Sequence, residues 1–164
     1  MSDIVESEIK GTYVAVKYNP YSLTKLIEVA HEYNVPNVIS LDDMHTTLIY
    51  STKGADTVEV HDKINYIGIP NKFNIWESQN GSKCLVLILN CNALVERNTE
   101  LMNKYDFVSD YPEYTPHITL SYDVGNWGNL EKLNEKIIKN KIYYMVVTTH
   151  EYVEDLNIGW KDDK

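Results

Sequence analysis

The chain has 164 residues, a formal net charge of −9 and an isoelectric point near 4.9. This length suits one domain with its own core, and the acidic charge argues against binding that neutralises many phosphates of long DNA or RNA. The first residues are acidic and the longest apolar run, 84–89, is too short to span a bilayer, so we expect a soluble, cytosolic protein without a signal peptide.

The first half of the chain predicts a strand, a helix and a second strand. Residues 13–18 are β-branched and aromatic, which is typical of a strand. Asn19 and Pro20 then suit the start of a helix that we expect to end near Tyr33. A loop leads into a strand at His45, and the segment 57–79 predicts two further strands broken at Pro70 and Asn71.

The second half repeats this order. The elements that we expect there are, in chain order, a strand at 83–90, a helix at 92–105, a loop at 106–116, a strand at 117–122, a helix at 130–138 and a strand at 143–152.

A six-residue pattern, H-x-T-L-x-Y, occurs in both halves, at His45 to Tyr50 and at His117 to Tyr122. His45 follows Tyr13, at the start of the first strand, by 32 positions, and His117 follows Cys84 by 33 positions. The organisation is therefore duplicated as well as the motif. We expect a single domain over 1–164 with two lobes, roughly 11–79 and 83–153.

Side chains alternate between the two faces of a strand, so the His and the Thr of each motif share a face. Strict alternation predicts an open face with one group of residues and an apolar back with another. The open face would carry His45, Thr47 and Ile49 with His117, Thr119 and Ser121; the back would carry Thr46, Leu48 and Tyr50 with Ile118, Leu120 and Tyr122.

A pseudo-two-fold relation between the lobes would bring both His-Thr pairs into one cleft. Two imidazoles can act as general base and general acid near neutral pH, and two Thr hydroxyls can hydrogen-bond phosphate oxygens. The histidines show no metal-binding spacing, and no glycine-rich nucleotide loop occurs, so we expect neither a metal nor another cofactor. We expect no catalytic role for His31, His61 or His150.

The twin motifs, in a chain of this size with this order of elements, resemble the 2H phosphoesterase superfamily. The resemblance implies an α+β fold: two pseudo-symmetric lobes with antiparallel sheets around a central cleft, and helices on the outer faces. It also implies that no metal is needed, that His45 and His117 are the catalytic pair, and that Thr47 and Thr119 are their phosphate-holding partners.

Within that superfamily the chain is most similar to the anti-CBASS phosphodiesterases of tailed bacteriophages, which destroy the cyclic oligonucleotide messengers of bacterial CBASS immunity. In that family an aromatic residue on the first strand, a central Trp, and a Glu and a Trp in the C-terminal tail contact the bases. The resemblance thus implies base contacts at Tyr13, Trp76, Glu154 and Trp160. Core packing of the Trp residues and a solvated charge at Glu154 remain the alternatives.

The activity implied is metal-independent cleavage of 3′–5′ linkages in cyclic di- and trinucleotides, in the cytoplasm of the infected bacterium. The implied partner is that substrate, with no long nucleic acid, no membrane and no obligate protein partner. One His would deprotonate the ribose 2′-OH and the other would protonate the leaving 5′-oxygen; the sequence does not decide which is which. The alternatives are a 2H enzyme acting on 2′,3′-cyclic phosphates at RNA ends or ligating tRNA halves, and a protein that sequesters cyclic nucleotides without cutting them.

Overall fold

The computed structural model describes residues 10–109 and 113–157. It is an α+β protein, as predicted. Its elements are β1 (Lys10–Tyr18), α2 (Pro20–Glu32), the short 3-10 helix η1 (Leu41–Asp43), β2 (His45–Ser51), β3 (Ile67–Glu77), β4 (Lys83–Asn90), α3 (Asn92–Tyr105), β5 (His117–Ser121), α4 (Leu130–Lys139) and β6 (Val146–Asn157).

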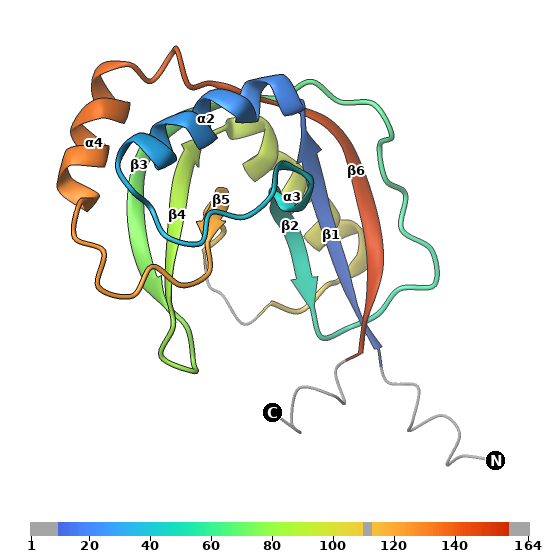
Figure 1. Ribbon diagram of the computed structural model, residues 1–164. Coiled ribbons are helices and arrows are strands. Elements are labelled where there is room, and N and C mark those ends of the chain that lie inside the picture. Colours follow the sequence, from blue (N-terminus) through green and yellow to red (C-terminus); the bar gives the residue numbers. More distant parts are fainter. Residues whose placement is uncertain (1–9, 110–112, 158–164) are drawn as a thin grey trace.

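The six strands form one antiparallel sheet in the order β2-β1-β6-β3-β4-β5. The two motif strands, β2 and β5, are therefore its two edges. Figure 1 shows the sheet curling so that these edge strands lie between β1 and β6 on one side and β3 and β4 on the other. The curl brings the two copies of the motif together at the centre of the molecule, with α4 outside β3.

Pairing divides the sheet into a His45 half, made of β2, β1 and β6, and a His117 half, made of β3, β4 and β5. Within residues 10–109 and 113–157, the ladders join the two halves only where Ile67 and Gly68 of β3 face Val147 and Val146 of β6. The last strand thus belongs with the first motif and β3 with the second. The pairing therefore does not follow the expected lobes, 11–79 and 83–153. β3, from the first part of the chain, pairs in the His117 half, and β6, from the second part, pairs in the His45 half.

The segment 57–79 holds one long strand rather than the two that we predicted. Pro70 and Asn71 do not break β3, because the register shifts between Pro70 and Lys72 and a bulge takes up the extra residue. A bulge accommodates a proline, which has no N–H for the ladder.

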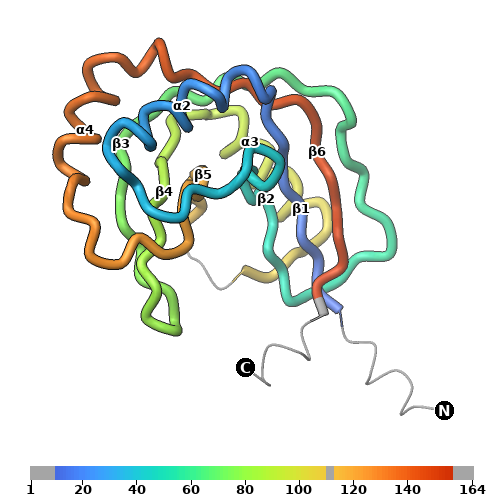
Figure 2. Tube along the Cα trace, in the orientation of Figure 1, coloured from blue at the N-terminus to red at the C-terminus, as the bar shows by residue number. Residues whose placement is uncertain are grey.

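The residues before β3 run in irregular conformation along β6, as Figure 2 shows. The backbone N–H of Ile64 donates to Thr149 O at 2.8 Å, and that of Glu151 donates to His61 O at 2.8 Å. The segment therefore covers the part of the β6 edge that β3 leaves unpaired.

A buried ion pair fastens this segment to α3. The carboxylate of Glu151, whose residue is 3% exposed, accepts from Arg97 Nε at 2.7 Å and from Arg97 Nη2 at 2.9 Å. The same carboxylate accepts the N–H of His61 at 2.8 Å, and Arg97 Nη2 also donates to Glu59 O at 2.9 Å. One charge pair thus connects β6, α3 and the segment that leads into β3.

The core is one cluster of apolar side chains that spans both halves of the sheet. Its largest fully buried members include Leu23, Leu26, Leu48, Phe73, Leu87, Leu94, Ile118 and Leu120. Among the described residues, none of the helices has the length and apolar character needed to cross a membrane.

We predict that Arg97→Met lowers the free energy of unfolding by about 3–5 kcal/mol, because it leaves the buried Glu151 carboxylate without its counter-charge. Urea unfolding measures the change. Lys104→Met is the control, because it removes an exposed ammonium 3.5 Å from the Glu59 carboxylate and exposed pairs contribute at most about 1 kcal/mol. Equal losses in the two variants would contradict the prediction.

Candidate active site

Each motif strand contains a β-bulge directly after its Thr. Between β1 and β2, Val14 lies opposite Ile49 and Ala15 opposite Thr47, so Leu48 is the extra residue. Between β4 and β5, Leu85 lies opposite Ser121 and Val86 opposite Thr119, so Leu120 is the extra residue. The two copies of the motif therefore share this irregularity at the same position.

The bulges overturn part of the predicted facing of the motif residues. Ile49 and Ser121, expected on the open face, are only 2% and 0% exposed. Tyr50, expected behind, lies opposite Tyr13, whose hydroxyl contacts Thr47, and Tyr122 is 53% exposed. One inserted residue reverses the alternation for everything after it. The His-Thr pairs precede the bulges, and all four residues are half-buried as the alternation predicts.

Both imidazoles are held in the same way. Nδ1 of His45 lies 2.8 Å from the carbonyl oxygen of Asp43, and Nδ1 of His117 lies 2.9 Å from that of Thr115. A carbonyl only accepts, so each Nδ1 carries the proton and donates it. In the neutral ring this leaves Nε2 as the basic nitrogen, available for proton transfer to or from a substrate.

A chain of two hydroxyls ties the motifs to each other. The fully buried Thr46 donates to the carbonyl oxygen of His117 at 2.8 Å, and the Tyr18 hydroxyl lies 2.6 Å from Thr46 Oγ1. Because Thr46 uses its own proton on His117, Tyr18 is the donor in the second bond. The backbone of His117 is thus fixed to Thr46, the residue that follows His45.

The carbonyl groups at the first bulge are bonded by side chains from other parts of the chain. The Tyr114 hydroxyl donates to Thr47 O at 2.7 Å, and Asn98 Nδ2 donates to Leu48 O at 2.7 Å. At the second bulge the backbone N–H of Ile39 donates to Leu120 O at 2.8 Å. These contacts satisfy groups that the bulges take out of the ladder.

Burial lowers the pKa of His117. The Thr115 carbonyl opposes this effect, and the neighbouring charge of His45 adds to it. The indole of Trp76 packs edge-on against the His117 ring, with centroids 4.5 Å apart. The lowered pKa favours a neutral His117 at neutral pH, the form in which an imidazole accepts a proton.

Tyr13 packs against the other pair. Its hydroxyl lies 2.9 Å from Thr47 Oγ1, and its ring is edge-on to His45 with centroids 6.2 Å apart. Burial raises the pKa of Tyr13. Tyr13 and Trp76, both predicted as base contacts, thus each contact a motif residue of their own half.

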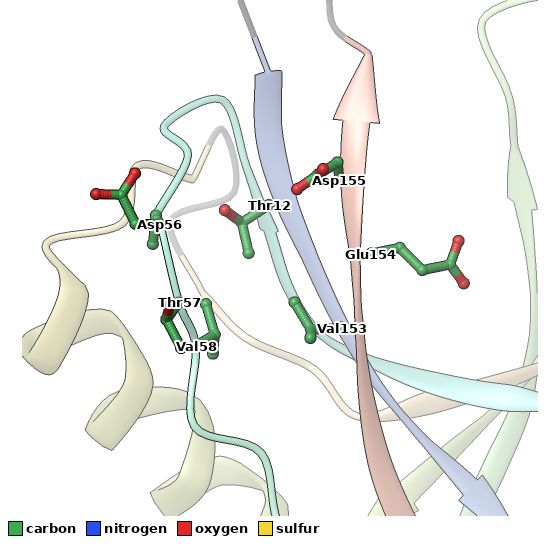
Figure 3. Close-up of a pocket in the computed structure, with 8 residues that line it drawn as sticks. Thr12, Asp56, Thr57, Val58, Val153, Glu154 and Asp155 are labelled. Atoms are coloured by element: carbon green, nitrogen blue, oxygen red, sulfur yellow. The ribbon is translucent and has the colours of Figure 1, made fainter.

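Glu154 lies opposite Tyr13 on β6. Figure 3 shows its side chain directed away from Asp56 and Thr57, which lie on the outer side of β1 and β6. Glu154 therefore lies on the same face of the sheet as Tyr13, which is called the inner face because it carries the His-Thr pairs. Trp160, the fourth predicted base contact, lies outside the described residues.

A cavity of about 840 Å³ opens beside the motifs, between β2, the end of β3, α3 and the loop before β5. The residues lining it include Thr47, Tyr50, Trp76, Asn98, Tyr114 and His117. The smaller hollow in Figure 3, about 300 Å³, lies on the outer side between Thr12, Val153 and the segment 55–58, and contains no motif residue. The larger cavity adjoins the motifs through Thr47 and His117, whereas His45 and Thr119 are not among its lining residues. The candidate site is therefore the two motifs together with this cavity beside them.

One cation belongs to the inner face near the first pair. Lys17 lies opposite His45 in the β1–β2 ladder, so the two side chains share a face. Its ammonium donates to Asp42 O at 2.5 Å and makes no ion pair with any carboxylate that the structure describes. In the described part of the chain no group of three His, Cys, Asp or Glu residues has metal-binding geometry.

Sequence reasoning missed Tyr18, Thr46, Tyr114, Asn98 and Lys17 as supports of the site. Only Thr46 carried a signal, because it is a hydroxyl residue on the face predicted to be apolar, where the second motif has Ile118. Tyr114 lies three residues before His117, and Tyr18, Asn98 and Lys17 come from positions with no spacing relation to the motifs.

Comparison with known proteins gives consistent relatives. Residues 10–163 match the family model described as Anti-CBASS protein Acb1. Proteins of that name are 33% identical in Acinetobacter phage Ac42 (93% of this chain and 95% of that protein) and 31% identical in Vibrio phage KVP40 (98% and 95%). The protein of Enterobacteria phage T4 is 31% identical over 93% of both chains.

Among solved structures, E. coli LigT complexed with 3′-AMP, a 2H phosphoesterase, superposes with a TM-score of 0.52 at 12% identity, covering 90% of this chain and 88% of LigT. At that identity the likeness concerns the fold. It agrees with the predicted 2H phosphoesterase architecture.

We predict that Thr46→Val lowers both stability and turnover. The change leaves the Tyr18 hydroxyl and the His117 carbonyl without a partner, which costs about 1–3 kcal/mol, and it frees the His117 backbone. Urea unfolding and kcat measure the two effects. Thr24→Val, on the exposed side of α2, is the control and should change neither. A Thr46→Val protein with unaltered kcat would show that the hydroxyl chain does not position His117.

We predict that His117 titrates with a midpoint below the usual 6.5, because burial disfavours its charged form. NMR of the imidazole nitrogens measures the midpoint directly. In His45→Gln the midpoint should rise, since a like charge is removed, yet stay below 6.5 because burial remains. A midpoint at or above 6.5 in the unaltered protein would contradict this account.

Proposed function

The chain belongs to the Anti-CBASS protein Acb1 family, and we propose that it is a phosphodiesterase that opens cyclic di- and trinucleotide messengers at a 3′–5′ linkage. It thereby degrades the cyclic nucleotides of host CBASS immunity. The observation that carries the proposal is the pair of motif imidazoles. Each has its Nδ1 bound to a backbone carbonyl, which leaves Nε2 for the substrate.

We assign the initial base to His117 and the initial acid to His45. The burial that lowers the pKa of His117 keeps it ready to accept a proton. His117 takes the proton of the ribose 2′-OH, and the 2′-oxygen attacks the adjacent phosphorus. The bond from phosphorus to the 5′-oxygen breaks as His45 gives that oxygen a proton. The products are a 2′,3′-cyclic phosphate and a free 5′-OH.

Hydrolysis completes the reaction with the two roles exchanged. His45, now neutral, takes a proton from water, and His117 returns its proton to the departing ribose oxygen, which leaves a phosphomonoester. Thr47 and Thr119 donate hydrogen bonds to the non-bridging oxygens, where charge develops. The Tyr13 hydroxyl, 2.9 Å from Thr47 Oγ1, supports this role when it donates, because Thr47 then has its own proton for the phosphate.

The size of the cavity beside the motifs and the net charge of the protein favour a small ligand with few phosphates. A cavity of about 840 Å³ is within the range of small-molecule sites, and a net charge of −9 disfavours long RNA. Lys17 supplies a cation on the face of His45. We propose that the protein acts in the cytoplasm of the infected host, where these messengers are made, and that it needs no metal.

The test is incubation with a 3′,3′-linked cyclic dinucleotide in EDTA, followed by mass spectrometry. We predict a linear product that ends in a cyclic or monoester phosphate. His117→Ala should lower turnover by about 10²–10⁴-fold, the usual contribution of a general acid or base. His31→Ala, on the exposed side of α2, is the matched control and should keep full turnover.

The other outcomes each point elsewhere. Tight binding without cleavage would favour sequestration, and neither binding nor cleavage would direct the next assay to RNA ends with 2′,3′-cyclic phosphates. Cleavage that EDTA abolishes, or near-normal turnover in His117→Ala, would contradict the paired acid-base mechanism.

A further inference from the structure

The mechanism uses the His and the Thr of each motif but not the Tyr that ends it. We propose that Tyr50 and Tyr122 are substrate-binding residues, one in each half of the sheet, that contact the two bases of a cyclic dinucleotide. This inference rests on the proposed function and deepens it. Its starting point is the pair of bulges after Thr47 and Thr119, which turns both tyrosines onto the face of the His-Thr pairs.

In the His45 half, Tyr50 belongs to a row of three residues across neighbouring strands. Tyr50 of β2 lies opposite Tyr13 of β1, which lies opposite Glu154 of β6. The rings of Tyr13 and Tyr50 meet edge-on with centroids 6.3 Å apart. Opposite residues in a ladder share a face, so Tyr50 completes a row whose other two members are predicted base contacts.

The His117 half contains the equivalent row. Tyr122 follows Ser121, which is opposite Leu85, and the Cys84 thiol donates to Tyr122 O at 3.5 Å. Cys84 lies opposite Trp76 of β3. The row is thus Tyr122, Cys84 and Trp76, and it too joins a motif tyrosine to a predicted base contact.

The hydroxyl of Tyr122 lies within electrostatic range of groups in the other half. Besides burial, Cys84 of its own half and Asp43, just before β2, both contribute to raising the pKa of Tyr122, and Tyr122 in turn contributes to raising the pKa of Tyr13 and Tyr152 on β1 and β6. Burial of the hydroxyl raises the pKa of Tyr122 although the residue is 53% exposed. Tyr122 therefore lies near the other half and keeps part of its surface open to a ligand.

Two aromatic rings, one from each half, match a ligand with two bases. Every base has a π-face, so an aromatic ring binds it with little regard to identity, which suits messengers that differ in their bases. Tyr50 also packs against Tyr13, so its replacement would disturb the residue that contacts Thr47. The test therefore depends on Tyr122, which has no such second role in the contacts that the structure describes.

We predict that Tyr122→Leu raises KM for a 3′,3′-linked cyclic dinucleotide about tenfold, within the effect of losing one base–aromatic stack, and changes kcat less than KM. Inorganic phosphate has no base, so its inhibition constant as a competitive inhibitor measures binding at the phosphate part of the site alone. Its inhibition constant should change less than twofold. Tyr122→Phe keeps the ring and should restore KM to near its original value. Tyr21→Leu, at a tyrosine 77% exposed on α2, is the control for surface changes.

Each other result overturns the inference in a recognisable way. An unaltered KM in Tyr122→Leu, with the dinucleotide still cleaved, would remove Tyr122 from the base site and leave the proposed function intact. Equal loss of dinucleotide and phosphate binding, or a loss confined to kcat, would assign Tyr122 to the phosphate site or to the fold. If the unaltered protein neither binds nor cleaves the dinucleotide, the proposed function itself fails, and this inference with it.

Discussion

The candidate site depends on bringing the two edge strands of one sheet into contact. β2 and β5 are the outermost strands, and in the described part of the chain the halves that carry them share two residue pairs in the ladder between β3 and β6. The hydrogen bond from Thr46 to the carbonyl of His117 joins the strands at the opposite end of this curl. This bond, the contacts between β2 and β5 and the common core keep the two motif strands together.

The bulges make the curl compatible with a satisfied backbone. A bulge bends and twists its strand, and here each one interrupts an edge strand just beyond the pair that must converge. The cost is a set of carbonyl groups without ladder partners, and it is offset by Tyr114, Asn98 and the backbone of Ile39. The residues that support the two motifs are therefore spread over α3 and two loops, while the proposed reacting groups stay on two short strands.

Much of the fold and the centre of the site could be predicted from the sequence, because both repeat. Duplicated periodicity predicts most elements, and the spacing of His and Thr predicts their common face. The rest depends on long-range contacts. No local pattern indicates that a bulge follows the Thr, so alternation assigned Tyr50 and Tyr122 to the wrong face. Similarly, hydrophobic periodicity does not indicate which strands pair with each other, so it could not predict the exchange of β3 and β6 between the halves.

That exchange explains why the predicted base contacts are scattered in sequence yet ordered in space. Glu154 is on the last strand but pairs with Tyr13 of the first, and Trp76 comes from the first half of the chain but packs on His117 of the second. The His45 half of the sheet thus includes β6 from the end of the chain, and the His117 half includes β3 from the first part of the chain. Under the proposed function, a cyclic dinucleotide bound between the halves would meet one row from each side, and such a ring has an approximate two-fold symmetry that a linear strand lacks.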